Sequence, residues 1–303
     1  MKIGFCGKGG TGKTTTTTLL ATYLAKNGNV LAIDSDTNEN LAYALGFDKS
    51  EIESMERIRK FNDEIFAYTK TQVDWKTRQV APVSDANYYE FIDGEMDEFL
   101  KSVSISKDNI SVAHLGNVEK DNKGITGMCS AYTLMRIFLN HLKVGTYNDY
   151  LLVDLLAGDE PLARSMIINL DEMLLVVEPT EKNLSVAKDI IQSLNKLEFE
   201  NFHILINKSF KIEDKEYVSE YLGIDISRIF RVEFSTEVLQ LDNNCELTFD
   251  KLPKSIKVEI EELFKSIKEN SNHSEELFIK RAKKIDERLY PDSNSKQTEK
   301  HHI

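Results

Sequence analysis

Short apolar segments recur along the chain, and each is followed by a longer segment whose apolar residues have helical spacing. Nearly continuous runs of β-branched and aromatic residues are typical of strands that are buried on both faces of a parallel sheet. The intervening segments are long enough to serve as helical crossovers. The pattern predicts a doubly wound, mostly parallel α/β fold. The predicted strands lie at 2–6, 30–33, 110–113, 150–153, 173–177 and 202–206, and the predicted helices at 13–27, 131–143, 161–169, 181–197 and 213–222.

Residues 48–109 interrupt this alternation. They are rich in charged and aromatic residues, include the lone Trp75, and show no clear periodicity. Two interpretations stay open: a surface excursion with its own small apolar cluster, or an element that binds a partner, because long segments of this kind are often functional. We therefore expect one domain over residues 1–270 with an insertion at about 48–109.

The C-terminal region contains two further helical patterns. Apolar residues at Ile256, Ile260, Leu263 and Ile267 predict an amphipathic helix that packs on the sheet. A second pattern predicts a C-terminal helix over 271–290, in which acidic residues flank the basic ones, so a solvated face is favoured over a membrane or nucleic-acid contact. Residues 291–303 have almost no apolar content and are expected to form a disordered tail.

The composition indicates a globular protein and limits the classes of partner that it is expected to bind. The 303 residues are 41% hydrophobic and 29% charged, which excludes collagen-like and wholly disordered chains. The formal net charge of −12 repels phosphate backbones and anionic lipid. Three distant cysteines cannot form a disulfide framework, no secretory signal is recognisable, and no apolar run approaches the ~18 residues of a membrane span. We expect a cytoplasmic protein.

A phosphate-binding motif follows the first predicted strand. Residues 7–14, GKGGTGKT, fit the P-loop pattern and lead directly into a predicted helix, a context that favours this interpretation over a plain glycine-rich turn. The glycines allow backbone N–H groups to surround phosphate oxygens, and the helix N-terminus attracts the anion. Lys13 would face the β- and γ-phosphates, Thr14 would bind Mg²⁺, and Thr15 would bind the α-phosphate. The predicted nucleotide-binding residues here are Gly9, Gly10, Thr11, Gly12, Lys13, Thr14 and Thr15.

The complete segment GKGGTGKTT, with Lys8 after the first glycine, resembles the deviant Walker A motif of the P-loop ATPases that include MinD, ParA and the nitrogenase iron protein. The resemblance implies Mg²⁺-dependent hydrolysis of ATP in a nucleotide-dependent homodimer. It also implies that Lys8 reaches the phosphates of the nucleotide bound by the other subunit. The expected cofactors are therefore ATP and Mg²⁺.

Further segments resemble landmarks of the same family. In AIDSD, residues 32–36, the second aspartate is Asp36, which by resemblance orients the attacking water. In VDLLAG, Asp154 would hold a Mg²⁺-bound water, and Asn207 with the adjacent Lys208 resembles the site that reads adenine. Residues 232–247 resemble the loop that closes over the base. The resemblance spans about 1–47 and 110–250, and it implies catalytic roles for Lys8, Lys13 and Asp36.

Within the family, the sequence most resembles the CooC branch, ATPases that assist maturation of carbon monoxide dehydrogenase. The residues that carry this resemblance lie at 115–119, 127–129, 154–158 and 177–180. CooC proteins have a Cys-x-Cys pair, whereas this chain has only Cys129 at that point. Two thiolates in a dimer cannot complete a tetrahedral transition-metal site without histidine or water, so Cys129 is either a metal ligand or an ordinary thiol.

The biological role has alternatives. The first is a maturation or metallochaperone-type ATPase whose unidentified client, by the resemblance to CooC, is expected to be a metalloenzyme. The second is a ParA- or MinD-type positioning ATPase that binds DNA or membrane in the ATP state, which the net charge disfavours. The third is a nucleotide-dependent interaction switch with little turnover.

Four other polar or sulfur-containing residues have simpler expectations. Cys6 lies within the first strand and is expected in the core. His114 ends a predicted strand and is expected as a core or rim histidine rather than a ligand. Asp34 is expected near Mg²⁺ and Lys13, and Glu178 either lines the nucleotide pocket or caps a helix.

Overall fold

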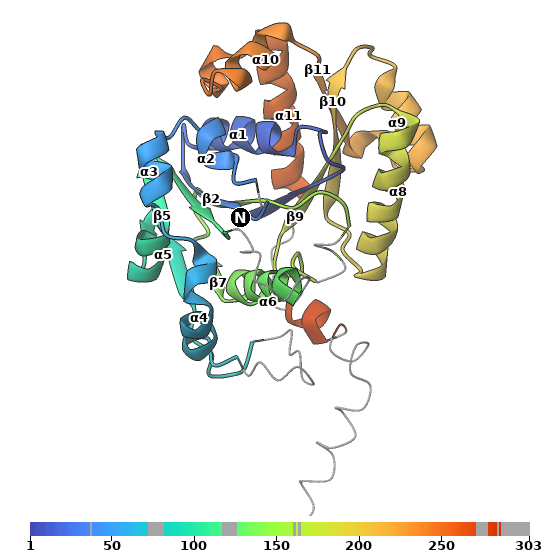
Figure 1. The fold of residues 1–303 in the computed structure, drawn as a ribbon. Helices are drawn as coiled ribbons and strands as arrows, with labels where there is room; N and C mark the ends of the chain where they lie inside the picture. The colour runs from blue at the N-terminus through green and yellow to red at the C-terminus, as the bar shows by residue number, and fades with distance from the viewer. Residues whose placement is uncertain are drawn as a thin grey trace, which may run out of the picture.

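The central sheet has its strands in the order β11-β10-β9-β1-β8-β2-β6-β5 (Figure 1). The computed structural model describes residues 1–36, 38–71, 82–116, 126–159, 162, 165–270, 278–283 and 285. Within these ranges, neighbouring strands of the sheet pair in parallel except β5, which runs antiparallel to β6 at one edge. The predicted doubly wound, mostly parallel fold is confirmed.

The elements have the following bounds: β1 (Lys2–Cys6), α1 (Lys13–Leu24), β2 (Asn29–Asp34), α2 (Leu41–Ala44), α3 (Lys49–Ser54), η1 (Ile58–Phe61), α4 (Asn62–Tyr68), β3 (Tyr89–Ile92), β4 (Glu95–Met96), α5 (Glu98–Val103), β5 (Ser104–Lys107), β6 (Ile110–His114), α6 (Thr126–Asn140), β7 (Leu142–Val144), β8 (Asp149–Asp154), β9 (Glu172–Val177), α8 (Glu181–Lys196), β10 (Phe202–Ser209), α9 (Asp214–Leu222), η2 (Ile226–Arg228), β11 (Ile229–Glu233), α10 (Thr236–Asn243), η3 (Phe249–Lys251) and α11 (Lys254–Asn270).

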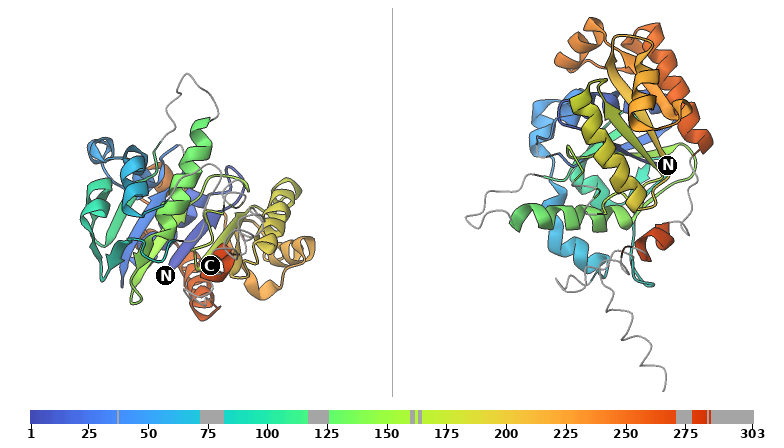
Figure 2. Two further views of the ribbon diagram at one scale, coloured as in Figure 1. Left: turned by 90° about the horizontal axis from the view of Figure 1, so that it is seen from below. Right: turned by 90° about the vertical axis from the view of Figure 1, so that its right-hand side faces the viewer.

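Both faces of the sheet are covered by helices (Figures 1 and 2). Successive side chains of a strand point to opposite faces, so β2 sends Leu31 and Ile33 into one core and Val30 and Ala32 into the other. Helices α6 and α8 cover the first face, and α1 and α11 cover the second. This two-sided burial explains why the strands read as nearly continuous apolar runs.

The predicted strands all form, and four of the five predicted helices correspond to α1, α6, α8 and α9. The helix predicted over 161–169 is wrong over 165–169, where the chain makes turns. Ser165 has a φ of 58°, in the left-handed region that interrupts a right-handed helix. Strand β11 and the small sheet β4-β3-β7 were not predicted, because their short strands lack a continuous apolar run.

The inserted residues 48–109 are part of the main core where the structure describes them. Ile58, Ile65, Phe91 and Leu100 are buried in the same cluster as the apolar side chains of α6. The expectation of a separate small cluster is therefore wrong. The helices within residues 48–109 are short, and each buries only a few side chains, so no periodicity shows in the sequence.

The C-terminal helix α11 buries the four residues that its spacing predicted, Ile256, Ile260, Leu263 and Ile267. Residues 278–283 are also helical, and Phe278, Ala282 and Ile285 pack against Ile168. The remainder of the predicted helix over 271–290, with Leu277 and Leu289, and the tail over 291–303 lie outside the described residues. None of the helices in the described ranges has the length and apolar character that crossing a bilayer requires.

Candidate nucleotide site

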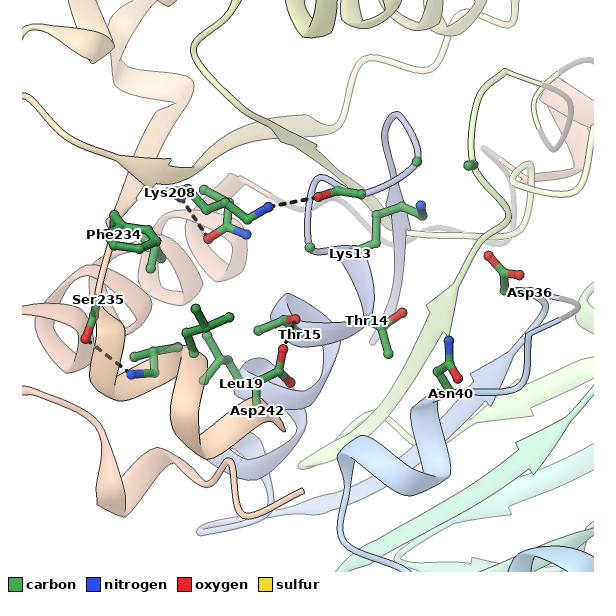
Figure 3. A pocket seen from close by; sticks show the side chains of 18 of the residues that line it. Lys13, Thr14, Thr15, Leu19, Asp36, Asn40, Lys208, Phe234, Ser235 and Asp242 are labelled. Atoms are coloured by element: carbon green, nitrogen blue, oxygen red, sulfur yellow. Dashed lines mark hydrogen bonds between the residues drawn. The ribbon is translucent and has the colours of Figure 1, made fainter. Parts of the chain in front are cut away.

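A cavity of about 460 Å³ opens at the carboxyl ends of the parallel strands, between the loop after β1 and helix α10 (Figure 3). This edge of a doubly wound sheet is where ligands bind in such folds. One wall is the P-loop with the first turn of α1, and the opposite walls come from the segment after β2 and from residues 232–242. The lining includes Gly9, Gly10, Gly12, Lys13, Thr14, Thr15, Asp36, Asn207, Lys208 and Asp242.

Glycines allow the P-loop to adopt its path. Gly7 and Gly12 have φ angles of 149° and 91°, which residues with a Cβ rarely adopt. A Cβ on Gly12 would overlap the Asn207 amide, and one on Gly7 would overlap the Val176 carbonyl. The loop is closed by Thr11, whose hydroxyl donates to the Lys8 carbonyl at 2.9 Å. The N-terminus of the 12-residue helix α1 therefore meets the cavity, and its free N–H groups favour an anion there.

Thr14 and Asp154 lie together beneath the P-loop. The Thr14 hydroxyl donates to Asp154 Oδ2 at 2.6 Å. Asp154 is 1% exposed, and among the described atoms its Oδ1 has no hydrogen-bond partner. Burial raises the pKa of Asp154 above its ordinary value, because an ionised carboxylate is poorly solvated there. A buried carboxylate with a free oxygen beside a hydroxyl suits Mg²⁺, which takes oxygen ligands and keeps several waters.

The segment after β2 carries Asp36 to the cavity, opposite the side formed by α10 (Figure 3). Asp34 holds this segment in place, since it accepts hydrogen bonds from the Asp36 N–H at 2.8 Å and the Leu41 N–H at 2.9 Å. The Ser35 hydroxyl also donates to the Asp154 carbonyl at 2.9 Å. Burial, together with the neighbouring Asp154 charge, raises the pKa of Asp34. In the structure, Asp34 thus braces the Asp36 segment.

Asn207 and Lys208, at the end of β10, contact the P-loop backbone. The Asn207 side-chain amide donates to the Thr11 carbonyl at 2.8 Å, and Lys208 Nζ donates to the Gly10 carbonyl at 3.0 Å. Lys208 also forms an ion pair with Glu178 at 2.6 Å. Glu178 is not among the lining residues and is instead the partner of Lys208. A role of Asn207 in reading adenine stays a prediction.

Residues 232–247, expected to close over the base, form the end of β11, helix α10 and the segment that follows. The Ser235 hydroxyl accepts from the Val238 N–H and caps α10. Asp242, at the end of α10, accepts a hydrogen bond from the Thr15 hydroxyl at 2.8 Å. Sequence reasoning missed Asp242, although the Ser-Thr-Glu run at 235–237 is a helix-start signal that could have placed α10. Apolar side chains from Val232, Phe234, Val238 and Leu239 line this end of the cavity.

The other candidate residues are further from the cavity. Lys8 is half-buried in the P-loop and is not among the residues that line its own chain's cavity. Cys6 is fully buried, as predicted, and burial raises the pKa of its thiol to about 12. Cys129 lies in α6, but its side chain is outside the described part of the structure. Among the described residues, no group of three or more His, Cys, Asp or Glu side chains is arranged to hold a metal.

The parallel sheet, the P-loop and the cavity at its mouth define a P-loop nucleotide-binding protein. Residues 5–300 match the CobQ/CobB/MinD/ParA nucleotide binding domain, and the chain belongs to this family. An uncharacterized ATP-binding protein of Methanocaldococcus jannaschii is 30% identical over 264 residues, which cover 83% of this chain and 96% of that protein. The carbon monoxide dehydrogenase accessory protein CooC of Rhodospirillum rubrum is 28% identical over 192 residues, which cover 63% and 67% of the two chains.

Solved structures share the fold at low sequence identity. A variant of Cyanothece McdA in complex with ATP has a TM-score of 0.60 at 16% identity, covering 90% of this chain and 98% of that one. The MinC:MinD cell division complex of Aquifex aeolicus gives a TM-score of 0.57 at 20% identity, with the same coverage. These likenesses confirm the fold.

Proposed function

We propose that this protein binds ATP with Mg²⁺ in the cavity and hydrolyses it. The observation that carries the proposal is the convergence of Lys13, Thr14 and Asp36 at one cavity, at the N-terminus of α1. Asp154 does not line the cavity but is hydrogen-bonded to Thr14, which does. Phosphoryl transfer needs mainly positioning and neutralisation of charge. Lys13 supplies a cation at the phosphates, and Thr14 with Asp154 would hold Mg²⁺, which offsets the charge of the phosphate oxygens. Asp36 orients the attacking water.

We further propose that ATP brings two copies of the chain together. This part rests on Lys8, whose place in GKGGTGKTT matches the trans-acting lysine of the deviant Walker A ATPases. A lysine that does not line its own cavity is available to approach a phosphate in a second subunit. Hydrolysis would then remove the charge that Lys8 neutralises and weaken the dimer.

The proposed biological role is assistance to a metalloenzyme partner, because the chain resembles a protein named as a carbon monoxide dehydrogenase accessory protein. The net charge of −12 disfavours the alternative of a DNA- or membrane-binding ATPase. The two roles differ in one measurable property, since only the second requires salt-sensitive binding to DNA or to anionic vesicles when ATP is present.

Titration with a fluorescent ATP analogue tests the nucleotide site. Lys13→Ala should abolish binding, because it removes the main side-chain cation at the phosphates. Asp36→Ala should bind ATP and Mg²⁺ but hydrolyse ATP slowly. The matched control is Lys49→Ala, which removes an exposed lysine that does not line the cavity. Unchanged affinity in Lys13→Ala would contradict the site, and unchanged turnover in Asp36→Ala would contradict the role of Asp36.

Sedimentation tests the dimer. The Asp36→Ala variant with ATP and Mg²⁺ should sediment as a dimer, and a Lys8→Ala/Asp36→Ala double variant should remain mostly monomeric. If Cys129 lies at the two-fold axis, the two thiols face each other, and mild oxidation should crosslink the ATP-bound dimer faster than the free chain. Equal crosslinking rates with and without ATP would remove Cys129 from the interface and from a shared metal site.

A further inference from the structure

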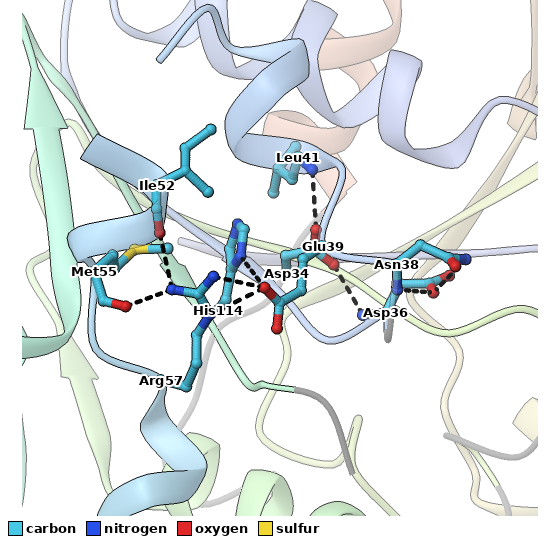
Figure 4. Close-up of polar contacts among 9 residues, drawn as sticks. All are labelled: Asp34, Asp36, Asn38, Glu39, Leu41, Ile52, Met55, Arg57 and His114. Carbon is cyan, nitrogen blue, oxygen red and sulfur yellow. Dashed lines mark hydrogen bonds and ion pairs between the residues drawn. The ribbon is translucent and has the colours of Figure 1, made fainter. Parts of the chain in front are cut away.

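An ion pair connects the Asp36 segment to the inserted residues 48–109 (Figure 4). Arg57 donates from Nε at 3.0 Å and from Nη2 at 2.7 Å to Glu39 Oε2. Both side chains are mostly buried, with exposed fractions of 26% for Arg57 and 14% for Glu39. A pair that is largely removed from water is held more firmly than an exposed one, and loss of one partner leaves an uncompensated charge.

Arg57 is itself fixed to the inserted segment. Its Nη1 donates to the backbone carbonyls of Ile52 and Met55, at the end of α3. Behind it lies Gly116, where an added Cβ would come within 2.8 Å of Arg57 Cβ. The planar guanidinium therefore joins one carboxylate to two carbonyls through fixed directions, an arrangement that the single ammonium of a lysine cannot reproduce.

Glu39 is held in a conformation that needs support. Its φ is 50°, which is uncommon for a residue with a side chain, and its N–H donates to the Asp36 carbonyl at 3.3 Å. His114 Nδ1 lies 3.4 Å from the same carboxylate oxygen that Arg57 binds. Burial acts to raise the pKa of Glu39, but the His114 ring and the Arg57 guanidinium outweigh burial and lower this pKa to about 2. The Glu39 carboxylate is therefore ionised at neutral pH.

We propose that Arg57 is a positioning residue for ATP hydrolysis: through Glu39 it fixes the segment that carries Asp36 to the cavity. The inference rests on the proposed function of Asp36. Asp36 lies three residues before Glu39, and the carbonyl of Asp36 accepts from Glu39, so displacement of Glu39 moves the water-orienting carboxylate. Within the described residues, the hydrogen bonds of Arg57 go to Glu39, Ile52 and Met55 and not to the P-loop or the Thr14–Asp154 pair, so phosphate binding should persist without Arg57.

The test compares Arg57→Gln, Arg57→Lys, Glu39→Gln and the double variant Glu39→Gln/Arg57→Gln. The matched control is Lys60→Gln, which removes a cation from an exposed ion pair with Glu56 in the same segment. Affinity for the fluorescent ATP analogue, kcat and KM are measured for each, with the thermal midpoint as a check of folding. Hydrogen exchange of the 38–41 amides reports directly on the segment, whether or not ATP is hydrolysed.

Arg57→Gln should bind the analogue within ~2-fold of wild type but lose about 10- to 100-fold in kcat, the effect of a small misplacement of a catalytic group. Exchange of the 38–41 amides should speed up in Arg57→Gln and Glu39→Gln and stay unchanged in Lys60→Gln. The double variant should be within ~2-fold of the slower single variant, because both changes break one interaction. Arg57→Lys should recover part of kcat.

Two results would overturn the inference. One is unchanged kcat and unchanged exchange in Arg57→Gln. The other is an equal loss of affinity and of kcat/KM with kcat intact, which would assign Arg57 to nucleotide binding instead. If the wild type fails to bind ATP, the proposed function fails, while the exchange measurement still decides whether Arg57 holds the Asp36 segment.

Discussion

Replacement of Thr14 by valine separates the role of one hydroxyl from the shape of the site. Valine keeps the size and branching of threonine but removes the donor that lies 2.6 Å from Asp154 Oδ2. The other oxygen of Asp154 already has no partner among the described atoms. Thr14→Val thus leaves a buried carboxylate without a hydrogen bond from the described side chains. A hydrogen bond to a charged group contributes roughly 1.5–3 kcal/mol to stability, so we expect Thr14→Val to lower the free energy of unfolding by about 2 kcal/mol at pH 8.

The effect should depend on pH. Burial raises the pKa of Asp154, so the folded chain binds this proton at a pH where the unfolded chain does not. Stability attributable to Asp154 therefore falls as pH rises above its ordinary pKa of 3.8. Thr14→Val raises that pKa further, because the hydroxyl favours the ionised form. The difference between variant and wild type should be largest at pH 8 and smaller at pH 5.

Urea unfolding without nucleotide measures this difference. With a slope of ~3 kcal/mol per molar, a loss of about 2 kcal/mol lowers the midpoint by roughly 0.7 M. The matched control is Thr17→Val in the same helix, because among the described residues the Thr17 hydroxyl donates to the Lys13 carbonyl and to no charged group. A Thr14→Val variant that is no less stable than Thr17→Val at pH 8 would refute the reasoning. Thr14→Val should also abolish any gain in ATP affinity from Mg²⁺.

Three further predictions concern the loop, the core and a histidine. Gly12→Ala should lower the free energy of unfolding, measured in urea, by about 2–3 kcal/mol, because φ at this position is 91° and the added Cβ displaces the Asn207 amide. Gly10→Ala should lower it by only about 1 kcal/mol, because the space around Gly10 is open. Ile260→Ala, at a fully buried position of α11, should lower the free energy of unfolding by about 2–5 kcal/mol, and Val258→Ala, at an exposed position of the same helix, by less than about 0.5 kcal/mol in the same assay. Burial lowers the pKa of His141, so the unfolded chain binds this proton first and stability falls as pH drops below 6.5. His141→Gln should therefore lose less stability than wild type between pH 7.5 and pH 5, and an equal loss would contradict this assignment.

The features that the sequence predicts are those with a local cause. The P-loop is a contiguous motif, and the central strands are buried on both faces, so their patterns are visible without knowledge of the fold. Strand β11 was missed because its outer position leaves Phe230 and Arg231 only partly buried, which breaks the apolar run.

The features that the sequence does not predict depend on distant contacts. The role proposed for Arg57 depends on the segments after β2 and β6 and the end of α3, which meet around its side chain. Asp242 lies 227 positions from Thr15, and no spacing rule connects the two. Glu178 sits at the expected edge of the sheet, yet its partner Lys208 comes from the neighbouring strand. Each of these contacts follows from strand order, which the local pattern leaves open.

The bracing of the P-loop by Asn207 and Lys208 has a consequence for the rate of nucleotide capture. Both side chains donate to P-loop carbonyls from β10, which is separated from β1 by β9, so contacts within the chain itself hold the loop in its shape. A ligand that meets a preformed loop does not have to wait for ordering of the backbone, and encounter then sets the association rate. Discrimination among nucleotides should therefore appear in how long each stays bound rather than in how fast each arrives.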